Sequence, residues 1–146
     1  LGYVKPHGAL YNDMMHDQRV FEAVMRGVAA VDASLPLVVL ALPNLEKYMS
    51  DAAQLQLTLW PEAFADRAYT DAGYLVPRSS KNSVLHERVR IIEQARMIAK
   101  HRQVRSENGI LISIPAITLC VHGDNPESVA TVAEIRSMLN EVESNL

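Results

Sequence analysis

A continuous apolar segment at residues 36–42, with the sequence PLVVLAL, restricts the fold of this chain more than any other feature. A run rich in β-branched residues and without polar alternation is typical of a strand covered on both faces, as in a parallel sheet. Residues 17–31 have helical spacing and a predicted buried face of four valines, Val20, Val24, Val28 and Val31. The N-cap of this helix is predicted to be one of Asn12, Asp13 and Asp17. A strand beside an amphipathic helix is the unit from which α/β folds are built.

The rest of the chain continues this alternation. Residues 2–5 are predicted to be the end of a short strand, and further strands are predicted over residues 56–60, 109–114 and 116–121. Helices are predicted over residues 44–53, over 84–103 and from Pro126 onward, with Asn44 and Asn125 as N-caps. The predicted buried stripes of the two later helices are Ile91, Ile92, Ala95, Ile98 and Ala99, and Val132, Ile135, Leu139 and Val142. The sequence therefore predicts one α/β domain over residues 1–146, with parallel strands and crossover helices.

Length, charge and cysteine content exclude several classes of protein. A chain of 146 residues can form one domain with a substantial core. The net charge of −3 argues against nucleic acid as a partner, and no apolar run approaches the roughly 20 residues of a membrane-spanning helix. One cysteine cannot form an internal disulfide and no signal peptide is recognisable, so we expect a cytoplasmic protein. Because the chain does not begin with Met, we interpret it as a fragment or a processed product.

Two turns with the same order of residue types follow predicted strands. The first contains Lys5, His7 and Asn12, and the second contains His122 and Asp124. In both, a His-Gly pair lies between an apolar run and the predicted start of a helix. Polar loops at the carboxyl ends of parallel strands meet along one edge of the sheet, where ligands bind. We therefore expect both imidazoles in one cleft, and the alternative for each is an ordinary turn.

A third polar cluster follows the strand predicted at residues 56–60. It contains Glu62, Asp66 and Arg67, and its two carboxylates are four residues apart, so they would share one face if the segment were helical. Paired carboxylates can divide acid and base roles or hold Mg²⁺. Helix capping and an ion pair with Arg67 are the alternative.

The residue types define what such a cleft could do. His7 and His122 are suited to acid–base chemistry or metal ligation, and Asp124 could orient an imidazole or bind a metal itself. Three cations are suited to hold a carboxylate or a phosphate, namely Lys5, Arg67 and Arg78.

Three further features of the sequence bear on the function of this predicted cleft. Residues 70–83 form a segment rich in Gly, Pro, Ser and Asn that is long for a loop, and we interpret it as an ordered lid. Cys120 lies in an apolar run and is expected to be a buried, inert thiol. The sequence has neither of the glycine-rich phosphate-binding motifs and no spacing of residues typical of a zinc site.

Four sequence blocks resemble the LamB/YcsF family, whose present name denotes the A subunit of 5-oxoprolinase. They are VKPHGALYN, FADRAY, GYLVPR and CVHGDNP, at residues 4–12, 64–69, 73–78 and 120–126. They occur in the order of the family, and the similarity covers essentially the whole chain but only about the C-terminal three-fifths of a family member. After Arg78, Asn82-Ser83 stands where the family usually has a Gly-Ala pair, so the lid is expected to differ locally.

The resemblance implies a partial (β/α) barrel of the seven-stranded, polysaccharide-deacetylase-like type. It implies ATP-dependent opening of the lactam of 5-oxo-L-proline to L-glutamate, in complex with 5-oxoprolinase subunits B and C. Those partners would handle the activation with ATP, and a divalent metal such as Mg²⁺ is a further expected cofactor. The site residues implied by the block match are Lys5, His7, Glu62, Asp66, Arg67, Arg78, His122 and Asp124, to which we add Asn12 of the first block.

Two N-terminal blocks of the family, Asn-Cys-Asp-Leu-Gly-Glu and Cys-Gly-Phe-His-Ala-Gly-Asp, are absent from this sequence. We therefore expect the chain to hold part of a site, and to form a homo-oligomer through exposed sheet edges and apolar helix faces. Two alternatives remain open: a shortened, non-catalytic family member, and a metal-dependent carbohydrate deacetylase or other amidohydrolase.

Overall fold

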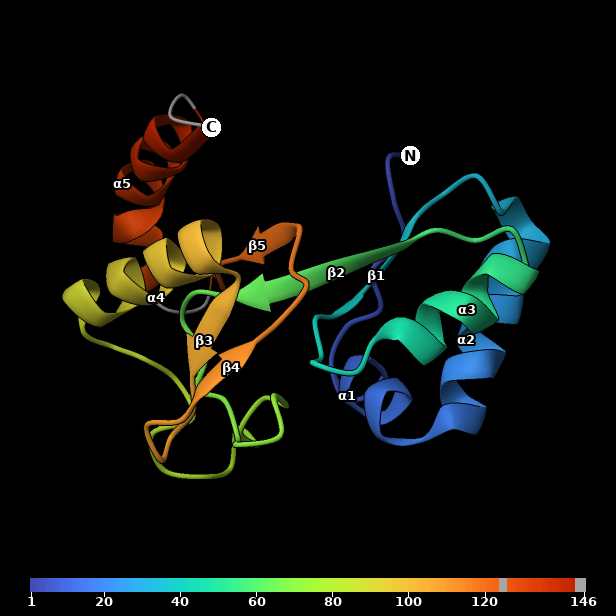
Figure 1. Cartoon of the computed structure of the whole chain (residues 1–146), viewed down its shortest axis with the longest axis horizontal. Coiled ribbons are helices and arrows are strands. Elements are labelled where there is room, and N and C mark those ends of the chain that lie inside the picture. Colours follow the sequence, from blue (N-terminus) through green and yellow to red (C-terminus); the bar gives the residue numbers. More distant parts are fainter. Residues whose placement is uncertain (124–125, 144–146) are drawn as a thin grey trace.

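The central sheet of the molecule is parallel, as the sequence predicts. The computed structural model describes residues 1–123 and 126–143, and its sheet contains β1 (Leu37–Leu40), β2 (Leu59–Phe64) and β5 (Thr118–Cys120) in the order β1-β2-β5 (Figure 1). Val4 forms a parallel bridge to Leu37, which adds a short segment to the free edge of β1. All four segments therefore run in one direction, and their carboxyl ends lie at the same edge of the sheet.

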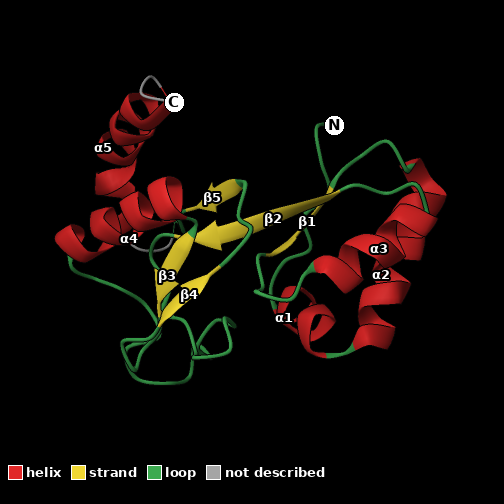
Figure 2. Ribbon diagram, viewed as in Figure 1, coloured by secondary structure: helices red, strands yellow, loops and turns green. Residues whose placement is uncertain are grey.

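The helices form two groups, one at each end of β2 (Figures 1 and 2). One group contains α1 (Ala9–His16), α2 (Gln18–Asp32) and α3 (Glu46–Gln54). The other contains α4 (Arg88–His101) and α5 (Pro126–Glu143), which pack against each other. None of the helices in the described part of the chain is long and apolar enough to cross a membrane.

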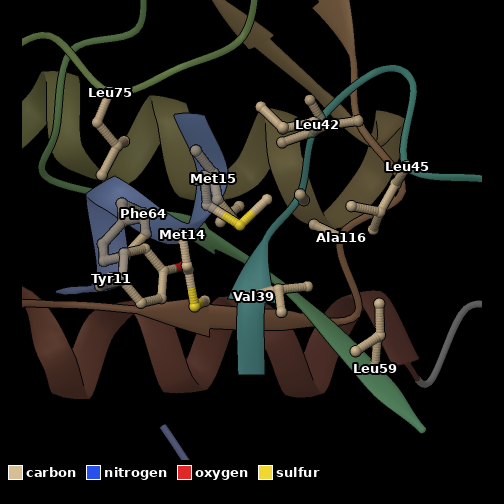
Figure 3. Close-up of a cluster of buried hydrophobic side chains, with 14 of the residues drawn as sticks. Tyr11, Met14, Met15, Val39, Leu42, Leu45, Leu59, Phe64, Leu75 and Ala116 are labelled. Carbon is tan, nitrogen blue, oxygen red and sulfur yellow. The ribbon is translucent and has the colours of Figure 1, made fainter. Parts of the chain in front are cut away.

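Two clusters of buried apolar side chains hold these groups to the sheet. The first cluster joins α1, α2, α3, β1 and β2, and Tyr11, Met14, Val39 and Phe64 belong to it (Figure 3). The Tyr11 and Phe64 rings meet edge to face, with 5.8 Å between their centroids. The second cluster consists of Ala65, Leu85, Ile91, Ile92, Ala95, Ile135 and Met138 and lies between α4, α5 and the segment after β2. β2 thus ends where the two clusters meet.

In two helices, α2 and α5, the buried face is rotated relative to the predicted one. In α2 the fully buried residues are Phe21 and Met25, and Val31 in the last turn is 85% exposed. The other three predicted valines flank this face and are half-buried. In α5, Val132 is 46% exposed, because Thr131, Ile135 and Met138 form the line of residues that is buried beside α4. Val142 of the predicted seam lies outside the residues whose side chains are described.

One of the three predicted helix caps is confirmed by the structure. Asp17 caps α2, since its carboxylate accepts a hydrogen bond from the Arg19 N–H at 2.8 Å. Asn44 does not cap α3, whose N-cap is Leu45. Asn125 lies outside the described residues.

Three elements differ from the sequence prediction. The helix α1 occupies Ala9–His16, where a polar loop was expected, because the chain becomes helical directly after Gly8. Residues 109–114 contribute β4 (Leu111–Ser113), which pairs antiparallel with β3 (Gln103–Arg105) instead of joining the parallel sheet. β2 continues through Pro61 to Phe64, since the Pro61 carbonyl accepts from the Ile117 N–H at 2.9 Å and pairing with β5 extends the strand.

Candidate active site

The edge at which the parallel strands end brings together residues that are far apart in the sequence. Lys5 follows the Val4 bridge, Glu62 and Phe64 lie in the last half of β2, and Cys120 ends β5. His122 comes two residues later. Glu62 was predicted to follow its strand, which was wrong, because residues 62–64 are extended and pair with β5. The condition for Glu62 and Asp66 to share a helix face is therefore not met, and only Asp66 follows the strand.

Lys5 and Glu62 form a largely buried ion pair. The distance from Lys5 Nζ to Glu62 Oε1 is 2.7 Å, and the two side chains are 17% and 7% exposed. Tyr11 donates a hydrogen bond to the other carboxylate oxygen, Glu62 Oε2, at 3.3 Å. Burial by itself lowers the pKa of Lys5, but the hydrogen bond and the charge of Glu62 outweigh it, so the pKa of Lys5 is raised. Lys5 is therefore a fixed positive charge at neutral pH.

Asp66 and His122 form a second pair. Asp66 Oδ1 lies 3.0 Å from His122 Nδ1, and Asp66 Oδ2 accepts the His122 backbone N–H at 2.9 Å. The Asp66 side chain is fully buried, whereas that of His122 is 25% exposed. The imidazole stacks on the Phe64 ring, with 5.3 Å between centroids and 16° between the ring planes. This arrangement places the proton of a neutral His122 on Nδ1 and leaves Nε2 as an acceptor.

A cavity of about 440 Å³ lies between these two pairs. Its lining includes both histidine-bearing turns, the end of β2 and the loop after it. The residues that line it are Lys5, Pro6, His7, Gly8, Tyr11, Asn12, Phe64, Arg67, Leu75, Arg78, Cys120, Val121, His122 and Gly123. The predicted convergence of the two turns on one cleft is thus what the structure shows.

His7 and Asn12 stand on one wall of the cavity, where α1 begins. His7 is exposed, and Asn12 Nδ2 donates to the Gly8 carbonyl at 3.2 Å. Gly8 is the N-cap of α1 at φ 63°, and no side chain caps the helix. Backbone N–H groups at such a helix start favour a negative charge nearby.

Arg67 and Arg78 also line the cavity, Arg78 from the loop at residues 70–83 and Arg67 from the segment before this loop. Arg67 is buried and donates from Nε to the Ser83 carbonyl at 3.1 Å and from Nη2 to the Val76 carbonyl at 2.6 Å. Arg78 is exposed at the cavity. Leu75, Val76 and Ser83 are buried, so the loop packs onto the domain through its own side chains.

Cys120 is less buried than predicted, whereas the predicted inertness of its thiol agrees with the direction of its pKa. It is half-buried, it lines the cavity, and its Sγ lies 3.4 Å from Lys5 Nζ. Burial and the charge of Glu62 raise the pKa of this thiol, and Lys5 acts in the opposite sense. The thiol is therefore accessible yet largely protonated at neutral pH.

Of the nine predicted site residues, the structure places six on the cavity and two directly behind it. The six are Lys5, His7, Asn12, Arg67, Arg78 and His122, and the two behind it are Glu62 and Asp66. Asp124 lies outside the described residues. Within the described part of the chain, no three His, Cys, Asp or Glu side chains are close enough together to hold a metal ion.

Sequence reasoning missed several residues that build the site. Tyr11 hydrogen-bonds Glu62, and Phe64 supplies the surface on which His122 stacks. Gln94 of α4 is buried and donates to three carbonyls of the segment that carries Asp66. Its position three residues after Ile91 puts this amide on the predicted buried stripe, and a polar residue there is a signal that could have been noticed.

A model of the LamB/YcsF family matches residues 1–146. The A subunit of 5-oxoprolinase from Vibrio cholerae serotype O1 is 50% identical over 141 residues, which are 97% of this chain and 56% of that protein. The 5-oxoprolinase A subunit numbered 2 in Pseudomonas putida is 43% identical over 143 residues, which are 98% of this chain and 55% of that protein.

Among solved structures, the lactam utilization protein from Thermus thermophilus superposes with a TM-score of 0.80 at 34% sequence identity. The match covers 96% of this chain and 56% of that one. The chain therefore spans a little more than half the length of the relatives that it matches.

Proposed function

The chain belongs to the LamB/YcsF family, and from this membership and its cavity we propose that it acts as part of the A subunit of a 5-oxoprolinase. The proposed reaction is the ATP-dependent opening of the lactam of 5-oxo-L-proline to L-glutamate. The observation that carries the proposal is that the Lys5–Glu62 and Asp66–His122 pairs flank one cavity of about 440 Å³. A volume in this range suits a small organic substrate.

In this proposal His122 is the general base. With Nδ1 held by Asp66, Nε2 accepts a proton from a water molecule whose oxygen bonds to the lactam carbonyl carbon. The same proton then passes from Nε2 to the ring nitrogen as the carbon–nitrogen bond breaks. The water thus supplies the new carboxyl oxygen, and the ring nitrogen becomes the amine of glutamate.

The cations of the cavity hold the substrate. Lys5, kept charged by Glu62, faces the negative charge that develops on the carbonyl oxygen. Arg78 and His7 are exposed at the cavity and, with Asn12 and the start of α1, bind the substrate carboxylate. Arg67 forms part of the same wall while it holds the loop at residues 70–83.

ATP would supply the driving force for the opening when the partner subunits are present, and its hydrolysis to ADP and phosphate would consume a second water molecule. The sequence has neither of the common phosphate-binding glycine motifs, which supports ATP handling with subunits B and C. Among the described residues no three His, Cys, Asp or Glu side chains are close enough together to hold a metal ion, and Glu62 and Asp66 are paired with Lys5 and His122. The steps proposed for His122 and Lys5 use these side chains and water.

The proposal also includes a barrel type, a location in the cell and self-association. The parallel sheet forms part of a (β/α) barrel of the seven-stranded, deacetylase-like type, which fits polar residues at the carboxyl ends of its strands. The protein functions in the cytoplasm, which its single cysteine favours. The chain self-associates, and exposed Ile117 and Val129 are apolar surface available for that contact. Light scattering at micromolar concentration tests this, and a monomer contradicts it.

The central test measures glutamate released from 5-oxoproline with ATP and the partner subunits. We expect His122→Ala to lower kcat about 10²–10⁴-fold, the usual contribution of a general base. Glu134→Gln, an exposed change on α5, serves as the control. Unchanged release in His122→Ala removes His122 from the chemistry, and no release by the unaltered protein favours a non-catalytic family member.

A further inference from the structure

We propose that Gln94 is the positioning residue of this site: it holds the turn that carries Asp66, so that Asp66 keeps His122 in one orientation and one tautomer. Gln94 lies on α4, and it is the one polar residue among the five buried residues of that helix. It does not line the cavity between the histidine turns. Its effect on the chemistry is therefore exerted through the backbone behind Asp66.

The amide nitrogen of Gln94 is surrounded by carbonyls of one short segment. Nε2 donates to the carbonyls of Phe64, Ala65 and Arg67, at 2.9, 3.2 and 2.8 Å. An amide group has two hydrogens, so at least one of them is shared between two carbonyls. The chain after β2 thus curls around a single nitrogen atom.

The one carbonyl in this segment that Gln94 does not bind is that of Asp66. This carbonyl accepts the Leu85 N–H at 2.9 Å instead. The four carbonyls of residues 64–67 are therefore all fixed, three by one side chain and the fourth by a backbone group. The backbone on both sides of the Asp66 Cα is held, which leaves the carboxylate little freedom to move.

That restraint matters because Asp66 binds His122 through both of its carboxylate oxygens. One carboxylate oxygen faces the imidazole Nδ1 at 3.0 Å and the other binds the His122 N–H at 2.9 Å. A displacement of the Asp66 backbone changes both distances together. Catalytic groups tolerate displacements of about 0.5 Å, so a small shift of this turn is enough to lose the preferred tautomer.

A second cavity determines which substitution tests the proposal. Gln94 also lines a space of about 140 Å³, together with Arg90, Arg105 and Glu107. A shortened side chain such as alanine would let water enter from this space and hydrogen-bond the same carbonyls. Gln94→Met keeps the approximate length of the side chain and removes the amide group with both of its donors, so it is the better variant.

The first readout is the ring tautomer of His122 in the free protein. Long-range ¹H–¹⁵N spectra at alkaline pH, assigned by comparison with His122→Ala, report which ring nitrogen carries the proton. We expect the Nδ1–H form in the unaltered protein and a mixture with the Nε2–H form in Gln94→Met. Ile98→Val on the same helix is the matched control, because it weakens the core and leaves the Gln94 amide in place, and the tautomer of His122 is expected to stay as in the unaltered protein.

The second readout is activity, and it rests on the proposed function. In the complete enzyme we expect Gln94→Met to lower kcat about 10-fold at unchanged KM, within the range for residues that orient a catalytic group through a hydrogen bond. If the tautomer changes while no lactam activity exists in any form, the positioning role stands and the proposed function fails. If Gln94→Met keeps the pure Nδ1–H form, the positioning role is wrong whatever the activity.

If Gln94→Met does not fold, a second variant still tests the proposal. Gln94→Asn keeps the amide but withdraws it from the carbonyls by one methylene. A mixed tautomer in Gln94→Asn supports the proposal, and an unchanged Nδ1–H tautomer in that variant overturns it.

Discussion

Lys5 connects three chemical features of the site. Its ammonium group bonds Glu62, lies 3.4 Å from the Cys120 sulfur, and stands 5.4 Å from the centroid of the Phe64 ring. Each contact favours the charged form of a group that is mostly removed from water. The charge of Glu62 at this position therefore serves first to keep Lys5 protonated, and a role as free base would require the pair to separate.

The Lys5–Glu62 ion pair leads us to expect that the free energies of unfolding of its variants are not additive. Glu62→Gln leaves a mostly buried Lys5 charge without its partner, and we expect a loss of about 2–4 kcal/mol, near the lower end for a buried pair because Lys5 keeps some contact with water. Chemical denaturation measures this loss. The double variant Lys5→Met/Glu62→Gln should recover part of it, since the uncompensated charge is then gone. Strictly additive losses in the two single variants and the double variant would contradict the coupling.

Cys120 provides an independent measure of the charges in the cavity. Because burial and Glu62 raise the pKa of the thiol, alkylation by iodoacetamide should be slow at neutral pH and reach half its maximum rate above the ordinary pKa of about 8.5. Lys5→Met removes the cation that favours the thiolate and shifts this profile to higher pH. Glu62→Gln removes the opposing anion and shifts it to lower pH.

Mass spectrometry reads the alkylation at a single position, since Cys120 is the sole cysteine of the chain. Cys120→Ser provides the blank. A profile that neither charge variant moves would mean that the thiol lies outside the field of the Lys5–Glu62 pair.

At the scale of elements, the apolar runs were sufficient to predict the parallel sheet and the long helices. The segment at residues 36–42 contains β1, and the predicted helix at residues 84–103 contains α4. The register of β2 was not predictable, because its continuation past Pro61 depends on pairing with β5, which is distant in sequence. Tertiary context decided that extension, as it often does for strands.

The candidate site could be predicted in part for a similar reason. The histidine turns were recognisable since their residue types are local, and parallel strands imply a common edge. The pairing of Asp66 with His122 joins two positions 56 residues apart, and the Gln94 contacts span 27 to 30 residues. Such contacts depend on helix packing, which no local pattern specifies.

Substitution by alanine is expected to destabilise the protein more at Gly73, in the loop at residues 70–83, than at Gly8, before α1. Gly73 has φ +87°, and a Cβ there would lie 2.7 Å from Pro43 Cδ, whereas Gly8 has φ +63° with open space around it. Both substitutions by alanine incur the cost of a left-handed backbone, about 1–3 kcal/mol. Only Gly73→Ala adds a clash with a rigid proline ring. We expect thermal unfolding to show a clearly lower Tm for Gly73→Ala than for Gly8→Ala, and equal values would show that the loop moves away from Pro43 without cost.

At the scale of the whole molecule, β2 and β5 join two clusters of unequal size. The first cluster packs helices on β1 and β2 through many large side chains, and the second joins α4 and α5 to the segment after β2. Leu119 of β5 packs against both clusters. The site lies where the two clusters meet, since Phe64 belongs to the first and Ala65 to the second.

This division predicts that α5 opens at a lower free energy than the sheet. The described side chains of α5 contribute Ile135 and Met138 to the smaller cluster, and regions with few buried apolar contacts unfold locally first. Native-state hydrogen exchange should therefore give α5 amides less protection than those of β1. Ile135→Ala should lower the opening free energy of α5 by about 2–4 kcal/mol and that of β1 by the same amount, because α5 is also open in the state in which β1 exchanges. Met25→Ala in the first cluster should lower the opening free energy of β1 and leave that of α5 unchanged, because Met25 stays buried while α5 alone is open. Equal losses in α5 and β1 for Met25→Ala would instead mean that the two clusters unfold as one unit.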